Sequence, residues 1–544
     1  MRQALFLFAL IVIAIALRFW QLGAVPASPD WDEVALGYNA YSISQTGKDE
    51  YGTSYPIILR SFDDYKPALY TYLVIPFIKM FGLEVFAVRM PSAILGVITV
   101  VAVYFLLKEL FKDQRIPVIG SLLFAISPWH LQFSRIAFES SVGLSFNIFA
   151  ILFFLKALKK PWFLLLSVFF AGLSLHVYQS EKVFVPLLFL ALTFIFRKEL
   201  FRLPKPYIGA SFLLGMLLTL PLIWQIATQP GALLRARGVS IFTDNTSFLA
   251  RTIGRLGVDM KQKDLLGLVL DNRRITYAFT AVSGYISHFD LNWLFIAGDQ
   301  QRHHAPNMGL LYLVELPFLL MGIYLFVFGP FEKKTKYFIF AWFLIAAIPA
   351  SITSGVPHPI RTLNFLPTFQ LFTAIGIIGA VAYLKSHISN PMLRYMLVGG
   401  YLFLAGFNFF YYLNQYFVQQ NIAYSQFWQY GYQQAVDFVN KEADGYDKIV
   451  VTNKPPLDQS YIFFLFYLKY PPEKYQEAAK NVSGGFSESH AFSKYEFRPF
   501  SWEEEERSSR ILFVGRPDDF PEDTSTVKTI YFLDGEEAIK FVQG

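Results

Sequence analysis

The stretch PSAILGVITVVAVYFLL, at residues 91–107, contains no acidic or basic side chain and approaches the ~20 apolar residues that a helix needs to cross a bilayer. Five more stretches lack Asp, Glu, Lys and Arg, at residues 140–155, 183–196, 206–234, 337–357 and 362–384. Over all 544 residues, 54% are hydrophobic and only 16% are charged, whereas about a quarter are charged in a typical soluble domain. The sequence therefore predicts a mainly α-helical, polytopic membrane protein.

Lys and Arg residues indicate how the predicted helices cross the membrane. The apolar run at 67–81 is short and contains Lys79, and if it crossed the membrane the loops after it would change sides. If it lies along the surface, we expect eleven spans, at residues 4–20, 86–107, 116–128, 139–157, 161–175, 182–197, 207–225, 308–329, 336–353, 362–384 and 394–413. We interpret 4–20 as a retained span, because no clear signal-peptide cleavage site follows it.

The second arrangement gathers the basic residues on one side of the membrane. It puts five clusters inside: Lys108/Lys112/Arg115, Lys156/Lys159/Lys160, Arg197/Lys198/Arg202/Lys205, Lys333/Lys334/Lys336 and Lys385/Arg394. The opposing short loops hold only Arg135, Lys182 and Arg361. Because cytoplasmic loops are enriched in Lys and Arg, we expect the N-terminus inside and the C-terminus outside. The same clustering explains the net charge of +6 without a nucleic-acid partner.

Three regions then face outward. Loops 21–85 and 226–306 belong to a transmembrane domain of residues 1–415, and a tail follows at 420–544. The tail contains WEEEERSSR and RPDDFPEDTST, which are typical of a soluble surface. Its helix-like segments (431–442, 459–469, 535–542) alternate with β-rich runs (448–452, 511–514, 527–533), and this predicts a small α/β domain. The chain has no cysteine, which excludes disulfides and thiolate metal sites.

The first outward loop contains the acidic pair Asp32-Glu33 and, further on, Lys66. Carboxylates near a membrane surface can act as a general base towards an acceptor hydroxyl or amine, or can hold a divalent cation. Lys66 is a compact cation suited to a phosphate. The alternative is structural: Asp32 caps a helix that begins nearby, and Lys66 contacts lipid headgroups.

The other outward loops keep ionisable residues that could bind a phosphate or substrate. The candidates are Arg135, Glu139, Tyr178, Lys182, Arg302, His303, His304, His358 and Arg361. Arg135 and Glu139 are four residues apart and could instead pair on one helix face. His303-His304 could hold a metal, but adjacent histidines rarely face one ion, and we predict no metal site. Glu315, about two turns into a predicted span, is either functional or hydrated near the interface.

Several motifs follow one another in a familiar order. The first span ends Arg-Phe-Trp-Gln-Leu-Gly, and Pro-Asp-Trp-Asp32-Glu33, Tyr65-Lys66-Pro67 and Phe86-Ala-Val-Arg89-Met-Pro-Ser come after it. This order resembles the protein-mannosyltransferase and aminoarabinose-transferase superfamily of GT-C membrane glycosyltransferases, often grouped as family 39. The resemblance is strongest over residues 1–200 and continues more loosely through 357–361.

The resemblance implies a helical bundle of GT-C type and an inverting glycosyltransferase. Such an enzyme moves a hexose or pentose from a polyprenyl-phosphate carrier to an extracytoplasmic lipid, polysaccharide or protein. By resemblance, Asp32 would be the general base, Glu33 would support the acceptor or the sugar, and Lys66 would contact the carrier phosphate. Arg135, Glu139, Tyr178 and Lys182 would line the same cavity. The lipid-linked sugar is the donor, and a divalent metal is compatible with the resemblance but not indicated by it.

This mechanism sets a geometric requirement. The base must act from the face of the anomeric carbon opposite to the leaving phosphate, which cations stabilise as it gains charge. We therefore expect Asp32 and the phosphate-binding cationic group on opposite walls of one cavity.

Two other functional classes stay open. A transporter or flippase for a polyprenyl lipid or glycolipid would also need many spans and a phosphate-binding cavity, but the matched repeats typical of transporters are not visible. A non-catalytic, carrier-binding assembly protein could keep Lys66 but has no need of Asp32-Glu33. The tail does not resemble the β-trefoil of eukaryotic protein mannosyltransferases. We therefore expect the protein to lie in a bacterial plasma membrane, in contact with membrane lipids.

Overall fold

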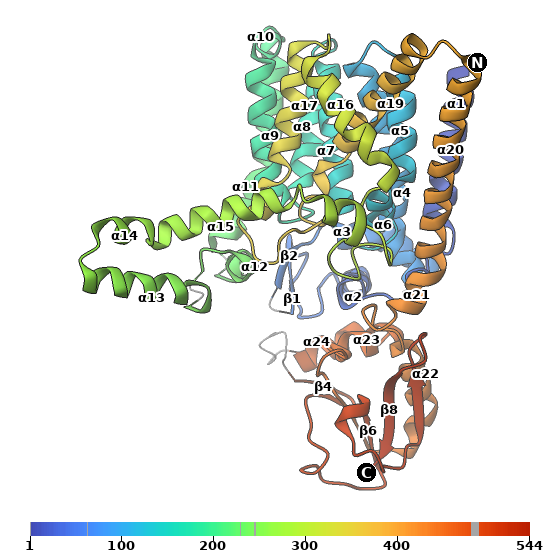
Figure 1. Cartoon of the computed structure of the whole chain (residues 1–544). Coiled ribbons are helices and arrows are strands. Elements are labelled where there is room, and N and C mark those ends of the chain that lie inside the picture. Colours follow the sequence, from blue (N-terminus) through green and yellow to red (C-terminus); the bar gives the residue numbers. More distant parts are fainter. Residues whose placement is uncertain (1, 63, 229, 244–245, 480–488) are drawn as a thin grey trace.

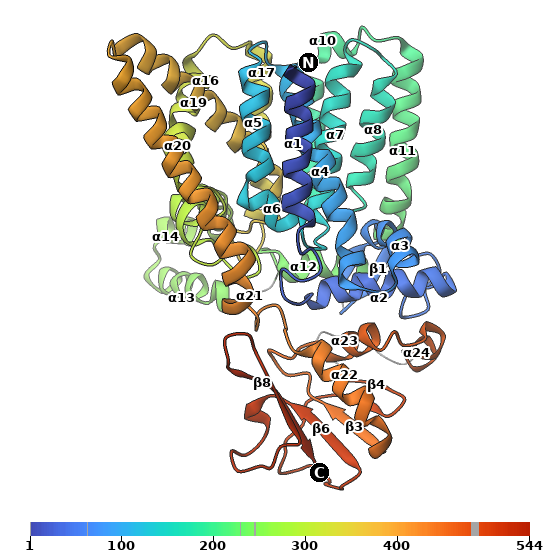
Figure 2. The same ribbon diagram turned by 90° about the vertical axis from the view of Figure 1, so that its right-hand side faces the viewer.

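The computed structural model describes residues 2–62, 64–228, 230–243, 246–479 and 489–544. Each of the eleven predicted spans coincides in sequence with a helix of the structure (Figures 1 and 2). These helices are α1 (Arg2–Phe19), α4 (Val85–Leu110), α5 (Arg115–Ile126), α7 (Ser140–Ala157), α8 (Phe163–Ser174), α9 (Glu181–Ile195), α11 (Lys205–Thr228), α16 (Leu316–Phe328), α17 (Lys333–Ile345), α19 (Thr368–His387) and α20 (Pro391–Asn414). The mainly helical, polytopic class is confirmed.

The number of membrane crossings stays a prediction. By length and composition, 5 helices of the described chain can cross a membrane, or up to 6 if α5 and α6 (Pro128–Ser134), bent by 55°, count as one span. α1, α8 and α16 belong to shorter apolar helices. α11 and α20 are almost wholly unburied within the protein although they are apolar, so their surroundings must be apolar too.

The loops that were expected outside gather at one end of the bundle. The first loop forms α2 (Trp31–Thr46), the hairpin of β1 (Ile58–Ser61) and β2 (Asp64–Pro67), and α3 (Leu69–Phe81). Figure 2 shows α2 and α3 side by side beneath the long helices. The apolar run at 67–81 therefore does not pass through the bundle, as the second arrangement of spans required.

The loop between α11 and α16 lies at the same end. It contains α12 (Leu234–Val239), α13 (Thr246–Gln262), α14 (Leu265–Leu270) and α15 (Arg273–Ser287), and α13 to α15 form an arm that reaches sideways (Figure 1). The N-terminus and α10 (Arg197–Leu200), with its basic cluster, lie at the opposite end.

The tail forms a mixed sheet covered by helices. Its strands are β3 (Lys448–Val451), β4 (His490–Phe492), β5 (Tyr495–Phe497), β6 (Ile511–Gly515), β7 (Lys528–Tyr531) and β8 (Glu537–Gln543), in the order β4-β5-β3-β6-β8-β7. β3 is parallel to β5 and β6, and the other pairs are antiparallel. The helices are α22 (Tyr432–Glu442), α23 (Ser460–Tyr467) and α24 (Pro472–Ala478). The predicted α/β composition is confirmed.

One predicted element of the tail is wrong. Residues 535–542 were expected as a helix, but 537–543 form β8, which pairs with both β6 and β7. Ala538, Ile539, Phe541 and Val542 are buried there. Pairing on both edges and burial outweigh the modest helix preference of the Glu-Glu-Ala sequence.

Candidate active site

Helix α2 begins at the acidic cluster, and Asp30 is the residue that caps it. Asp30 Oδ1 accepts a hydrogen bond from the Glu33 backbone N–H at 3.0 Å, and Glu33 Oε2 accepts one from the Asp30 backbone N–H at 3.4 Å. The two form a capping box, which satisfies two otherwise unpaired backbone donors. The structural alternative for Asp32 is therefore wrong: the cap lies two residues earlier.

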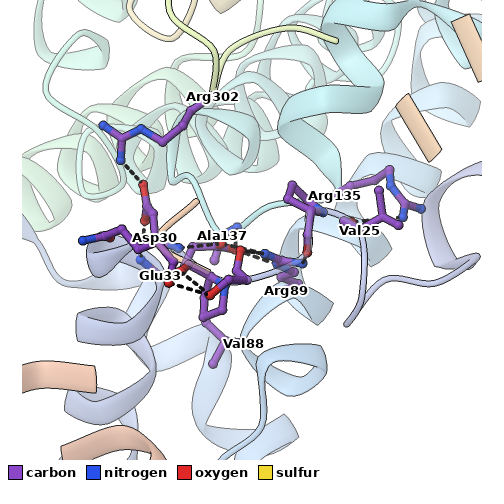
Figure 3. A network of polar contacts seen from close by, with 12 residues as sticks. Val25, Asp30, Glu33, Val88, Arg89, Arg135, Ala137 and Arg302 are labelled. Atoms are coloured by element: carbon purple, nitrogen blue, oxygen red, sulfur yellow. Dashed lines mark hydrogen bonds and ion pairs between the residues drawn. The ribbon is translucent and has the colours of Figure 1, made fainter. Parts of the chain in front are cut away.

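Asp30 also joins the first outward loop to the second. Its Oδ2 accepts a hydrogen bond from Arg302 Nη1 at 2.6 Å (Figure 3). The Arg302 guanidinium also lies 4.6 Å from the centre of the Trp31 ring. Burial raises the pKa of Asp30 to about 7, although the positive charge of Arg302 opposes this shift. Arg302, from a loop far along the chain, thus reaches the first turn of α2.

Glu33 is held by a residue of the Phe-Ala-Val-Arg segment. Arg89 Nε and Nη2 each donate to a Glu33 carboxylate oxygen at 2.9 Å, and both side chains are buried (Figure 3). Glu33 Oε1 also accepts the Ala137 N–H at 2.8 Å. Arg89 Nη1 donates to the Leu22 and Pro26 carbonyls. Glu33 therefore ties α2 to α4 and to the segment before α7.

Asp32 has a different environment from its two acidic neighbours. Its side chain is 32% exposed, and it forms an ion pair with Lys66 of β2. Both residues line a cavity of about 260 Å³ beneath the bundle. The other lining residues are Trp31, Phe62, Pro67, Phe138, Glu139, Tyr178, Gln179, Gln300, Arg302, His303, His358 and Ile360. Six predicted site residues besides Asp32 meet here, from three outward loops and the segments before α7 and α9.

A second cavity adjoins the first through Tyr178 and Gln179, which line both. It has a volume of about 300 Å³ and a mostly apolar wall that includes Ile226, Leu233, Val239, Pro349 and Ile352. Two cations stand in that wall, Lys182 and Arg361.

Polar contacts hold these cations and link the two cavities. Lys182 Nζ donates to Gln179 Oε1 at 2.6 Å, and Gln179 Nε2 donates to the Tyr65 carbonyl at 2.9 Å, next to Lys66. Arg361 Nη1 donates to Thr353 Oγ1 at 2.6 Å and to the Ser354 carbonyl at 2.7 Å.

Lys66 does not lie opposite Asp32 and so is not the cationic group required on the other wall. The two side chains are in contact and so occupy the same wall of the first cavity. The strand pairing of β1 with β2 sets Lys66 opposite Leu59 and turns its ammonium towards the first turn of α2. Lys182 and Arg361, in the adjoining cavity, are the cations that lie away from this pair.

Arg135 and His304 lie outside the lining of both cavities, as far as the described residues define them. Arg135 is fully buried and donates to four backbone carbonyls of residues 17–25 and to the Tyr416 hydroxyl. It follows the end of α6, and residues 135–139 form no helix, so the alternative of a helical pair with Glu139 is wrong. His304 Nδ1 contacts the Ala305 carbonyl at 2.9 Å.

Two histidines of the first cavity lie next to one another. The rings of His303 and His358 are 5.1 Å apart, and His303 Nδ1 contacts Asp299 Oδ2 at 2.7 Å. Burial lowers the pKa of His303, although Asp299 opposes this. In the described part of the chain, no group of three or more His, Cys, Asp or Glu side chains could hold a metal ion.

Glu315 is buried at the start of α16, and its Oε2 accepts a hydrogen bond from Thr373 of α19 at 3.4 Å. It lies outside the lining of both cavities, as far as the described residues define them. Its functional role stays a prediction.

Three residues of the site were missed as functional candidates. Arg89 stood inside a quoted motif, and an arginine beside a predicted span was the available signal. Asp30 stood next to the acidic pair, and its position two residues before Asp32 fits an N-cap. Gln179 had no signal, because an uncharged side chain in a short loop is common.

Comparisons with known proteins agree with this fold. Residues 65–224 match the family model described as dolichyl-phosphate-mannose-protein mannosyltransferase. The comparisons confirm the resemblance to the GT-C membrane glycosyltransferases. A search of curated proteins found no match.

Among solved structures, the chain is similar to ArnT from Cupriavidus metallidurans. In the apo state the TM-score is 0.56 at 10% identity, over 99% of this chain and 98% of that one. With ArnT bound to undecaprenyl phosphate it is 0.55 at 10% identity, over 98% and 97%. The Archaeoglobus fulgidus oligosaccharyltransferase tethered to an acceptor peptide gives 0.48 at 13% identity over 85% of this chain, which spans 62% of that protein's length.

Proposed function

We propose that this protein transfers a sugar, with inversion, from a polyprenyl-phosphate carrier to an extracytoplasmic lipid, polysaccharide or protein. One observation carries the proposal: a polar cavity that contains the partly exposed carboxylate of Asp32 adjoins an apolar cavity that contains two cations. A lipid-linked sugar needs both environments, because its prenyl chain is apolar and its phosphate is anionic. The positive-inside pattern supports a site on the outer face of a plasma membrane.

Asp32 is the proposed general base. Its carboxylate takes the proton from the acceptor hydroxyl or amine, and the acceptor atom forms a bond with the anomeric carbon. The bond from that carbon to the phosphate oxygen breaks, and its electron pair leaves with the polyprenyl phosphate. Lys66, by its ion pair, holds the Asp32 carboxylate in the cavity.

Lys182 and Arg361 are the proposed partners of the leaving phosphate. Both stand in the apolar cavity and both are anchored by hydrogen bonds, so they need little rearrangement when the phosphate gains charge. This assignment replaces Lys66 as the phosphate contact. Glu33 and Arg89 are proposed as positioning residues, because their buried pair holds the first turn of α2 against α4.

Release of the carrier tests the proposal. Purified protein is incubated with a polyprenyl-phosphate sugar labelled in the prenyl chain, together with extracted envelope lipids and glycans as acceptors. We expect polyprenyl phosphate to be released, and Asp32→Asn to reduce the rate by about 10²-fold or more, since general-base catalysis contributes about 10²–10⁴-fold. Unchanged expression and thermal unfolding would show that Asp32→Asn is folded.

Near-normal release by Asp32→Asn would reject Asp32 as the base. Movement of intact labelled lipid across vesicles, without any release of the carrier, would instead favour a transporter. Asp113→Asn is a suitable control, because Asp113 is an acidic residue paired with Arg115 at the opposite end of the bundle.

A further inference from the structure

The arm formed by α13, α14 and α15 stands apart from the rest of the molecule. It leaves the bundle at the end that holds the candidate site and extends sideways, roughly perpendicular to the long helices (Figure 1). Both views show α14, at its tip, nearer the level of the long helices than α13 is (Figures 1 and 2).

The tip of the arm is apolar and exposed. α14 has the sequence LLGLVL, and Leu265, Leu266, Val269 and Leu270 are all exposed, Leu265 to 78%. A soluble surface seldom presents four adjoining large apolar side chains unless another apolar phase covers them.

α15 continues the apolar surface towards the bundle. Ile275, Phe279, Val282 and Ile286 follow the helical spacing of four, three and four residues and are all exposed, Phe279 to 74%. Because of this spacing the four side chains share one face of the helix.

The opposite face of α15 packs within the protein. Gly284 lies on that face, so close to α18 (Ile348–Ser351) that a Cβ there would be 2.9 Å from the Ser351 carbonyl oxygen. At the side of the helix, the Thr276 hydroxyl contacts the Thr252 hydroxyl of α13 at 3.0 Å. The exposed apolar face of α15 therefore lies opposite the face that packs against α18.

The charges of the arm suit a lipid surface. Residues 246–287 contain six basic and three acidic side chains, a net charge of +3. Amphipathic helices of this kind, with apolar residues on one face and Lys or Arg beside it, lie in the interface of a bilayer. The exposed apolar surface of α11, with Leu217, Leu220 and Trp224, leads directly to the loop that carries the arm.

We propose that the arm lies in the headgroup layer of the membrane, with α14 and the outer face of α15 inserted among the lipids. The partner is the bilayer leaflet on the side of the candidate site, and anionic headgroups favour the contact. The segment that precedes the arm, at the end of α12, forms part of the second cavity: the Ile241 N–H donates to the Ile352 carbonyl at 3.2 Å, and the Ser354 N–H to the Val239 carbonyl at 2.7 Å. Inserting the arm therefore places the neighbouring wall of that cavity, formed by α12, near the membrane surface.

The absence of cysteine makes a direct test possible. Full-length Leu266→Cys and Phe279→Cys are labelled with an environment-sensitive fluorophore and placed one copy per nanodisc, in equal parts of phosphatidylcholine and phosphatidylglycerol. Arg251→Cys, at an exposed position of α13, is the matched control. We expect a blue shift for labels at 266 and 279, quenching by lipids spin-labelled near the headgroup, and loss of quenching by aqueous iodide, whereas iodide quenches the label at 251.

Equal iodide quenching at all three positions would overturn the proposal. Protection of 266 and 279 that arises only in discs with two copies would also overturn it, because a second chain would then be the occupant. The readout needs no transferase activity, so it is independent of the proposed function.

Discussion

Asp30, Asp32 and Glu33 lie within one turn of α2, yet each carboxylate has a different partner. Asp30 contacts Arg302, Asp32 contacts Lys66, and Glu33 contacts Arg89. Asp30 and Glu33 are buried, and their ion pairs hold the turn in place, whereas the Asp32 side chain lines the cavity. Three cations from three segments thus leave one carboxylate of the turn accessible to a substrate.

The buried pair of Glu33 and Arg89 predicts a large loss of stability on truncation. Arg89→Met leaves the Glu33 charge buried without its bidentate partner, and we expect it to lower the free energy of unfolding by about 3–5 kcal/mol. Thermal unfolding in detergent measures the effect. Arg115→Met is the control, because the Arg115–Asp113 pair is exposed and contributes at most about 1 kcal/mol. Equal losses in both variants would contradict a stabilising role for Arg89.

At the scale of elements, the short segment between α8 and α9 forms the partition between the two cavities. Tyr178 and Gln179 line both cavities. Lys182, the second residue of α9, lines the apolar cavity. The chain on the other side, around Arg361, is braced by its contacts with Thr353 and Ser354. Residues far apart in sequence therefore present two cations to one apolar cavity.

These two cations predict a selective effect on the lipid carrier. Lys182→Ala and Arg361→Ala each remove a charged donor, and we expect the KM for the carrier to rise about tenfold, since such hydrogen bonds contribute about 1.5–3 kcal/mol. The KM for the acceptor should change little. Steady-state kinetics with each substrate varied in turn measures both, and Lys198→Ala, exposed at the opposite end, is the control. Equal rises for carrier and acceptor would argue against phosphate binding there.

At the scale of the whole molecule, the α/β domain of the tail is fastened to the helix that carries Asp32. The Gln429 side chain accepts the Trp31 N–H at 3.1 Å, and Gln476 Nε2 donates to the Ser42 and Thr46 hydroxyls and the Asp49 carbonyl. Glu50 is buried in this contact, where it accepts hydrogen bonds from Asn39 Nδ2 at 3.1 Å and the Tyr461 hydroxyl at 3.5 Å.

Glu50 predicts a pH dependence of this contact. Burial raises the pKa of Glu50 to about 8 from 4.5, while the hydrogen bond from Asn39 opposes the shift. The folded state then holds a proton that the unfolded chain has released, so the free energy of unfolding falls as the pH rises from about 4.5 to about 8. Thermal unfolding across this range should show the decline in wild type and a flatter profile in Glu50→Gln. Glu84→Gln, at an exposed contact with Lys469, should keep the wild-type profile.

The orientation in the membrane gives a further prediction for the whole chain. If the five basic clusters face the cytoplasm, a membrane-impermeant maleimide added to intact cells labels Ser525→Cys in the tail but not Ser386→Cys at the end of α19. Both positions are exposed, and the native chain offers no competing thiol. If only Ser386→Cys were labelled, the protein would have the opposite orientation in the membrane.

The sequence by itself determined the class of the protein and much of its layout. Charge-free stretches report directly on burial in lipid, and Lys and Arg clusters report on the side of the membrane, because both are properties of composition. The order of the motifs around Asp32, Lys66 and Arg89 was likewise enough to indicate the GT-C glycosyltransferases. The strand at 537–543 could not be predicted from the sequence, because its pairing with two neighbouring strands determines its conformation.

Only the tertiary structure decided which ionisable residues face the cavities. Arg135 and Lys182 have the same kind of local sequence, a lone cation in a short loop. Arg135, however, donates its hydrogen bonds to backbone carbonyls, whereas Lys182 lines an apolar cavity. Lys66 was expected to contact the carrier phosphate, but the β1–β2 hairpin sets it against Asp32. The physical reason is the same in each case: the partner of a buried or paired charge comes from a distant segment, and packing alone brings the two together.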